Sequence, residues 1–482
     1  MRTADYIIII VYIIAMLGVG AYARTRIKSI DDYLVAGNRF KVISLVGTLM
    51  AALIGAGMTM GIVGGTYTYG SGVIWNYIGF AVGLVLFALV YSTRMRSTGK
   101  RTMAEIIAGE FGRLPRFFVG IFAAIYAFGS MTLCVTGMGR LLTYIGADWG
   151  ISLTTAVIIT TIVTVGYTAL GGFYSVVWTD LVQFFIMIAI VIVIGPIITI
   201  SSVGSVGEVA QAFADNGTSL FNPFEGVPVA YIIASFVLLA ISVPGDPTVP
   251  QRALAGESNK VVKKSFFISA ALTVLFGMGL TFIGAGAVAM LPNIEATYGT
   301  TEAAFPAFIL EFYPVGLTGL GIAALMAAIM STISAMLLVG TTHLVYDAGK
   351  AIKPDIKDST LNKALPIAIL IVGVVVTFVA LKVTSLAAVL YFIFSLCGSA
   401  FLFPMLFTLY WKKASKWGIT TGILSGGITC LSMYLSGNMG PGGDPVYMGM
   451  VASLVCILLF SFAIPGGRQT DSTMMLKSEE AK

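Results

Sequence analysis

The chain has 482 residues, of which 57% are hydrophobic and only 10% are charged. In soluble domains about a quarter of the residues are charged, so this composition excludes an ordinary soluble enzyme. Its hydrophobicity also excludes a disordered chain. The net charge of +6 could by itself indicate a nucleic-acid partner, but the distribution of the positive charges argues against that interpretation.

Long apolar runs fill most of the sequence. A helix needs about 20 apolar residues to cross a bilayer, and the sequence contains thirteen runs of this kind. We therefore expect an all-α membrane protein with about thirteen transmembrane helices. The expected spans are 6–24, 43–69, 73–93, 117–145, 151–170, 177–201, 229–245, 265–291, 316–346, 365–383, 386–410, 417–435 and 446–465.

The connections on one side of these spans collect the positive charge. They hold 25 of the 28 Lys and Arg residues. Cytoplasmic loops attract Lys and Arg, so we expect the N-terminus outside and the C-terminus inside, and no nucleic-acid partner. These connections are 24–41, 94–116, 171–176, 246–264, 347–364, 411–416 and 466–482.

Two spans carry residues that interrupt a helix. The second has five glycines between Gly55 and Gly65, and the seventh ends in Pro244, Gly245, Asp246 and Pro247. Glycine costs about 1 kcal/mol per helix position, and proline removes a backbone donor. Irregular backbone at membrane depth is tolerated where it lines a cavity or is buried in protein. The alternative for the second span is that its glycines serve only close helix packing.

The two interrupted spans stand five helices apart. Because five is odd, a repeat of that length places its second copy upside down, and a five-plus-five inverted repeat with discontinuous first helices is typical of secondary transporters. We expect one transporter domain over 1–482. It divides into a peripheral first helix and loop (1–41), repeat one (42–201), repeat two (229–410), and two peripheral helices with a cytoplasmic tail (411–482).

Few polar groups inside the spans could hold an ion. Asp180 is the most deeply placed carboxylate, and buried carboxylates often mark an ion path. The alternative is a helix start, since acids suit that position. The ninth span contains Ser331, Thr332 and Ser334 after Ala328. Their oxygens suit a hard cation such as Na⁺, although such hydroxyls also bond back to their own helix.

Four stretches resemble the sodium/solute symporter family, in order and on the expected spans, and the ninth-span stretch is similar to its sodium/proline branch. The stretches are 32–37, 167–183, 251–252 and 328–334. The resemblance implies a leucine-transporter-like fold and a Na⁺ site between the first and eighth core helices. Its implied ligands are the carbonyls of Ala51, Ile54 and Ala328 and the hydroxyls of Ser331 and Thr332. Some family members hold a second Na⁺, for which Asp180 and Ser334 match, but Ala335 replaces a further hydroxyl. Asp180 is therefore also a candidate for the ion-release path.

The fold analogy also implies a substrate cavity between the spans. Its expected lining is apolar with a few neutral polar groups, which suits a small, partly apolar solute. Leu53 and Gly55 depart from the proline branch, so other small carboxylates remain open. The candidate substrate-binding residues are Gly55, Met58, Thr59, Trp75, Asn76, Cys134, Thr136, Phe236, Tyr391, Phe394 and Ser395.

The functional expectation is a Na⁺-coupled symporter of the cell membrane, not an enzyme. It would import a small organic solute, an amino acid such as proline or a small carboxylate, by alternating access, with the monomer as the functional unit. The alternatives are a Na⁺-coupled sugar or pantothenate-like vitamin symporter, a proton-coupled transporter, or a channel. A channel would be expected to show a filter repeat or rings of pore charges, and neither is visible in the sequence.

Overall fold

The described part of the chain is helical throughout. The structure, a computed structural model of the full sequence, describes residues 1–25, 33–34, 39–146, 149–383, 386–438 and 444–469. Within these residues there is no β-strand, and ten helices are long and apolar enough to cross a membrane, or eleven with one bent pair. This number is below the expected thirteen for two reasons. Two apolar helices, Val42–Leu53 and Leu153–Ala169, are short, and the helical parts on the two sides of Gly70, which has φ 49°, count together as one span over 57–97.

The α-helices follow in chain order, with short 3₁₀ or π segments between some of them. They are α1 (Thr3–Arg24), α3 (Val42–Leu53), α4 (Ile62–Tyr69), α5 (Ile74–Leu86), α6 (Ser92–Ser97), α7 (Met103–Phe111), α8 (Arg113–Ile145), α9 (Leu153–Ile188), α10 (Gly195–Val203), α11 (Val206–Asp215), α12 (Val229–Ser242), α13 (Thr248–Ala255), α14 (Asn259–Met290), α15 (Ile294–Tyr298), α16 (Ala304–Phe312), α17 (Leu317–Thr341), α18 (Gly349–Ile352), α19 (Asp358–Ala380), α20 (Leu386–Tyr410), α21 (Lys416–Ser436) and α22 (Pro445–Ala463).

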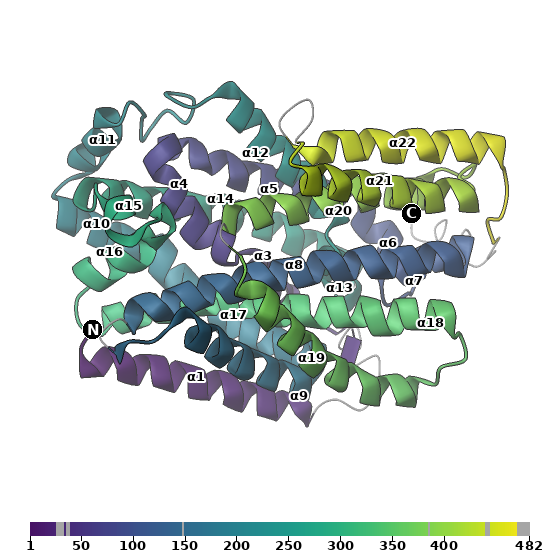
Figure 1. The fold of residues 1–482 in the computed structure, drawn as a ribbon, viewed down its shortest axis with the longest axis horizontal. Helices are drawn as coiled ribbons and strands as arrows, with labels where there is room; N and C mark the ends of the chain where they lie inside the picture. The colour runs from purple at the N-terminus through teal and green to yellow at the C-terminus, as the bar shows by residue number, and fades with distance from the viewer. Residues whose placement is uncertain (26–32, 35–38, 147–148, 384–385, 439–443, 470–482) are drawn as a thin grey trace.

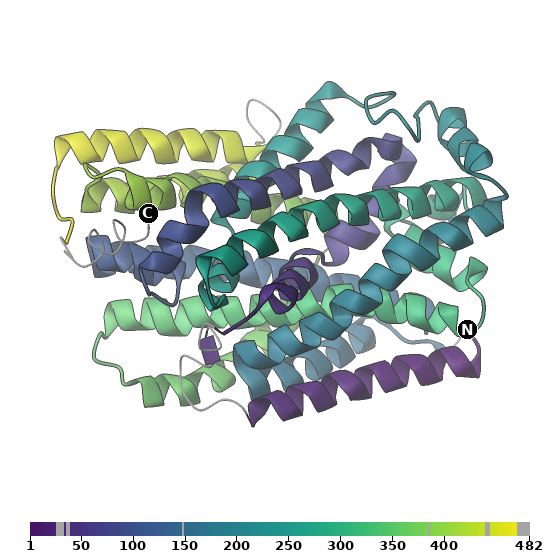
Figure 2. The ribbon, with the colours of Figure 1, turned by 180° about the vertical axis from the view of Figure 1, so that it is seen from behind.

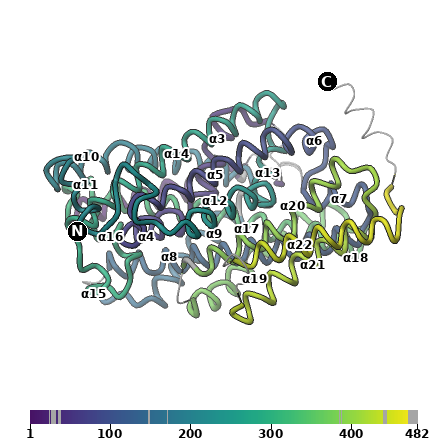
Figure 3. The backbone as a smooth tube through the Cα atoms, turned by 90° about the horizontal axis from the view of Figure 1, so that it is seen from above, coloured from purple at the N-terminus to yellow at the C-terminus, as the bar shows by residue number. Residues whose placement is uncertain are grey.

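Helix α17 is the centre of the bundle. The most apolar stretch of this helix is buried along its whole length, and α17 packs against α8, α9, α1 and α3. The long helices run side by side, with α1 along one edge and the α21–α22 pair along the opposite edge (Figures 1 and 2). Viewed from above, α10, α11, α15 and α16 gather at one end of the bundle, and α6, α7 and α18 at the other (Figure 3).

The chain leaves the helical conformation at both places where the sequence predicts an interruption. Helix α3 ends at Leu53, where Ile54 has φ −104° and ψ 81°, and a π-helical turn follows at Gly57–Gly61. The second break follows the 3₁₀ turn Val243–Gly245, and the helical axis bends by 50° there. The two interruptions therefore expose main-chain polar groups inside the bundle.

The structure reduces the expected connection 171–176 to a kink. Two helical parts of α9 meet at Gly172, which leaves helical geometry with φ 49°. A glycine tolerates this backbone, and a Cβ at this position would lie 2.6 Å from the ring of Tyr33. The connection 246–264 is also largely helical, since α13 and the start of α14 occupy it.

Candidate ion and substrate site

The break after α3 faces the hydroxyl patch of α17. The Ser331 hydroxyl lies 2.7 Å from the carbonyl oxygen of Ala51 and 3.0 Å from that of Ala328. The Thr332 hydroxyl lies 3.4 Å and 3.2 Å from the same two carbonyls. Four of the five expected Na⁺ ligands therefore meet in one place. The two hydroxyls contact a carbonyl of another helix, α3, as well as carbonyls of their own helix.

The fifth expected ligand, Ile54, is the residue at which α3 ends, and its N–H donates to Met50. Its peptide thus lies in the interrupted backbone, three residues after Ala51. The oxygens of this group are all neutral and buried. Neutral carbonyl and hydroxyl oxygens suit a monovalent hard cation, whereas a divalent ion would favour carboxylates.

Asp180 lies deep in α9 and not at a helix start. It is eight residues beyond the Gly172 break, and it is fully buried. The Thr48 hydroxyl donates to its Oδ2 over 2.6 Å. Ser334, the other residue of the expected second site, bonds to the carbonyl of Ser331 over 2.9 Å. The capping interpretation of Asp180 is therefore wrong, and this carboxylate connects α9 with α3.

Arg252 is the basic partner that the sequence did not reveal. Its guanidinium lies 3.8 Å from Asp180 Oδ2, and both side chains are fully buried. It also donates to the carbonyls of Thr48 and Thr248, over 3.2 and 3.1 Å. In the sequence, residues 251–252 stand out only by their resemblance to a family motif. A charged residue just after a broken span is a signal that would have identified it.

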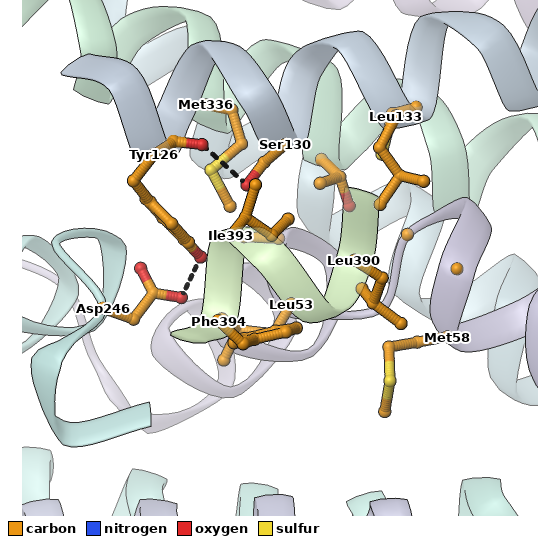
Figure 4. A pocket seen from close by; sticks show the side chains of 15 residues that line it. Leu53, Met58, Tyr126, Ser130, Leu133, Asp246, Met336, Leu390, Ile393 and Phe394 are labelled. Atoms are coloured by element: carbon orange, nitrogen blue, oxygen red, sulfur yellow. Dashed lines mark hydrogen bonds between the residues drawn. The ribbon is translucent and has the colours of Figure 1, made fainter. Parts of the chain in front are cut away.

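A small cavity lies beside the ion ligands, and Figure 4 shows the side chains that line it. Thr332 belongs both to the oxygen group and to the cavity wall. Four expected substrate residues line it, namely Gly55, Met58, Cys134 and Phe394. Ten further lining residues are not among the substrate residues that the sequence predicts: Ala52, Leu53, Gly57, Tyr126, Ser130, Leu133, Asp246, Met336, Leu390 and Ile393.

Three further substrate candidates lie outside the cavity wall on α5 and α12. Trp75 donates from Nε1 to the carbonyl of Pro223 over 3.1 Å, and its ring meets that of Phe236 at 6.3 Å. Asn76 donates to the Tyr231 hydroxyl over 3.0 Å and to the carbonyl of Val73 over 3.1 Å. The chain itself therefore supplies polar partners for Trp75 and Asn76.

The remaining candidates are also outside the wall. Thr59 bonds back to Gly55 over 2.9 Å, and Thr136 bonds to the carbonyl of Ala380 over 3.0 Å. Tyr391 accepts on its carbonyl from the Ser395 hydroxyl over 2.7 Å. That hydroxyl also lies 2.6 Å from Asp444, where burial raises the pKa of the carboxyl.

Charged residues near the two ends of the bundle form ion pairs. Arg140 pairs with Glu302 at one end. At the other end Asp347 is fully buried and bonds to Arg116 over 2.9 Å. His343 is 3% exposed and lies 2.9 Å from Asp347.

The whole arrangement has a clear counterpart among known proteins. Residues 33–426 match the sodium:solute symporter family. The chain belongs to this family. It is 28% identical to the high-affinity proline transporter PutP of Bacillus subtilis, over 92% of this chain and 95% of that protein. It is 27% identical to the sodium/pantothenate symporter of Haemophilus influenzae, over 87% of this chain and 88% of that protein.

A solved structure shares the fold of this sodium:solute symporter. A Na⁺-coupled sialic acid symporter, in a substrate-bound outward-open state, superposes with a TM-score of 0.83 at 20% identity, covering 97% of this chain and 99% of that one. The chain is therefore a multi-pass plasma-membrane transporter with Na⁺ as its coupling ion, and not an enzyme.

Proposed function

We propose that this symporter imports a small, partly apolar organic solute, first of all an amino acid such as proline. The observation that carries this proposal is the shared wall of the two sites, because Thr332 lies both in the oxygen group and in the cavity. Relatives named as proline transporters support the same solute class. The second candidate solute is a carboxylate vitamin, because another relative is named a sodium/pantothenate symporter. The apolar wall disfavours a sugar, which needs many hydrogen-bonding groups.

We propose that Ala51, Ile54, Ala328, Ser331 and Thr332 bind the Na⁺, and that Asp180 lies on its release path. Gly55, Met58, Cys134 and Phe394 would contact the solute. Five other candidates would not contact the solute directly but would belong to the helices around the cavity: Trp75, Asn76, Phe236, Tyr391 and Ser395. The fully buried Asp180 contacts both α3 and Arg252 of α13, so a change at the ion site is coupled to both broken helices.

The transport cycle follows from these assignments. We propose thirteen spans with the N-terminus outside, the C-terminus inside and a five-plus-five inverted repeat, in a functional monomer. Ion and solute would favour the same conformation, and this shared preference is what couples them. A membrane potential of 100 mV contributes about 2.3 kcal/mol per charge moved fully across. The solute would therefore accumulate at the expense of the Na⁺ gradient.

Uptake into proteoliposomes tests this function. Vesicles containing the purified protein should accumulate radiolabelled proline under an inward Na⁺ gradient, and not under an inward K⁺ gradient. A pH gradient of matched size, imposed without Na⁺, is the control for proton coupling. Equal accumulation with the pH gradient would contradict the assignment of Na⁺ as the coupling ion. Pantothenate and glucose, measured in the same vesicles, compare the alternative solutes.

A further inference from the structure

The substrate cavity has one charged wall. Asp246 stands at the break between α12 and α13, and it is fully buried. Among the described residues that line the cavity, it is the only one with a carboxyl or basic side chain. Figure 4 shows its carboxylate at one end of the cavity, joined to the hydroxyl of Tyr126, with Phe394 and Leu53 close by.

Hydrogen bonds hold this carboxylate in a fixed orientation. Its Oδ1 accepts from the N–H of Thr248 over 2.8 Å and from the Thr248 hydroxyl over 2.7 Å. Its Oδ2 accepts from Tyr126 over 2.6 Å. A carboxylate oxygen can accept two hydrogen bonds, so Oδ2 keeps one position for a donor from the cavity. The group is thus a prearranged acceptor rather than a mobile side chain.

The guanidinium that acts on this acceptor electrostatically is already engaged by a second carboxylate. Arg252 is fully buried and forms its ion pair with Asp180. In the described part of the chain, Asp246 forms no ion pair within 4.0 Å. Two buried carboxylates therefore share one guanidinium. A buried charge is costly unless it is paired, and in a membrane protein such a group usually marks a substrate or ion position.

We propose that Asp246 binds a protonated amino or imino group of the transported solute. This inference rests on the proposed function and narrows its substrate class to small ammonium compounds with an apolar body, which the walls formed by Leu133, Leu390 and Ile393 would contact. A charge-assisted hydrogen bond to Oδ2 is stronger than a neutral one. Carboxylic acids of the same shape that lack the amino group lose this bond, so they bind at least tenfold more weakly.

Matched ligand pairs test the proposal on the purified full-length protein. Thermal unfolding is measured in NaCl and in KCl with L-proline against tetrahydrofuran-2-carboxylate, and with L-alanine against lactate. Pantothenate is included as a further acid that has no amino group. A panel of the other amino acids and small amines completes the set. We expect Na⁺-dependent stabilisation by at least one amino compound, at concentrations at least tenfold below those that its matched acid requires.

Two variants assign the effect to this residue. Asp246→Asn should abolish the preference for the amino member of each pair while retaining stabilisation by Na⁺ alone. Tyr126→Phe removes one hydrogen bond but keeps the carboxylate, so the preference should persist. If Asp246→Asn does not fold, the wild-type pairs still test the proposal, because it is overturned when no amino compound is preferred over its matched acid.

The possible outcomes separate this proposal from the proposed function. Stabilisation by Na⁺ together with pantothenate or a matched acid, and by no amino compound, would overturn the ammonium assignment and leave Na⁺ coupling intact. An unchanged preference in Asp246→Asn would overturn it as well, and so would the absence of stabilisation by every amino compound. Loss of all Na⁺ dependence in the wild type would instead contradict the function itself.

Discussion

Arg252 and Asp180 form a fully buried ion pair at 3.8 Å that joins α13 to α9. The pair also contacts α3, because Thr48 donates its hydroxyl to Asp180 and accepts on its carbonyl from Arg252. Both broken helices, α3 and the α12–α13 pair, therefore meet α9 at one cluster of charge. A movement of the backbone at either break therefore changes the surroundings of Asp180, Arg252 and Thr48.

Removing the Arg252 guanidinium alone should destabilise the fold more than removing both charges of the pair. Arg252→Gln leaves Asp180 buried and unpaired, which costs about 3–5 kcal/mol of folding free energy. The double variant Asp180→Asn with Arg252→Gln should lose less than Arg252→Gln alone. Unfolding of the purified proteins in detergent measures the coupling between the two charges. Strictly additive losses would show that the pair does not interact.

Asp180→Asn should also raise the Na⁺ concentration for half-maximal uptake while the protein stays folded. The physical reason is that the carboxylate lies between α9 and α3, the helix that supplies the Ala51 carbonyl. Proline uptake as a function of Na⁺ concentration measures this effect. Wild-type Na⁺ dependence in this variant would restrict Asp180 to a structural role.

The Na⁺ ligands themselves give a second test. Ser331→Ala and Thr332→Ala each remove one hydroxyl, worth about 1 kcal/mol, so the Na⁺ concentration for half-maximal uptake should rise roughly fivefold to tenfold. The matched control is Thr341→Ala on the same helix, whose hydroxyl bonds back to Leu337 over 2.7 Å. That control should leave the Na⁺ dependence unchanged. Equal effects from all three variants would point to a general weakening of α17.

The sequence was informative where a local pattern has one physical meaning. The glycines of 55–65 and the prolines at 244 and 247 predict breaks, and the chain leaves helical geometry at both. The order of Ser331 and Thr332 predicts an oxygen patch on one helix face. Arg252 and Asp246 were missed as functional candidates, because their partners Asp180 and Tyr126 are 72 and 120 residues away in the chain. Only the packing of α13 against distant helices brings such groups together.

The substrate candidates outside the cavity wall show the same limit of what the sequence alone can predict. Trp75 and Asn76 are aromatic and polar residues on an expected span, which is all that the sequence offers. The structure supplies their partners from Pro223, which precedes α12, and from Tyr231 within α12, about 150 residues further along the chain. Whether a polar side chain faces a cavity or a neighbouring backbone depends on these tertiary contacts and not on its own helix.

Asp347 should be a strong determinant of stability at the other end of the bundle. It accepts from Arg116 over 2.9 Å and from Thr102 over 2.9 Å, and His343 lies at 2.9 Å. Asp347→Asn should cost about 3 kcal/mol, because it removes the ion-pair partner of the largely buried Arg116 guanidinium. Asp358→Asn is the matched control, since its side chain is 43% exposed and exposed pairs contribute about 1 kcal/mol or less. Thermal unfolding of both variants measures the difference, and equal losses would contradict it.

Gly55 lies where the ion group and the cavity meet, and it leaves no room for a side chain. A Cβ at this position would lie 2.8 Å from Thr332 Oγ1 and 2.9 Å from Cys134 Sγ. Gly55→Ala should therefore displace an ion ligand and a cavity wall together, and lower Na⁺-driven uptake at least tenfold. Gly61→Ala is the matched control in the same interrupted segment, because a Cβ there meets no atom within 4 Å. It should transport like the wild type. If Gly61→Ala were equally impaired, the flexibility of the glycine-rich segment, rather than the space beside Thr332, would control transport.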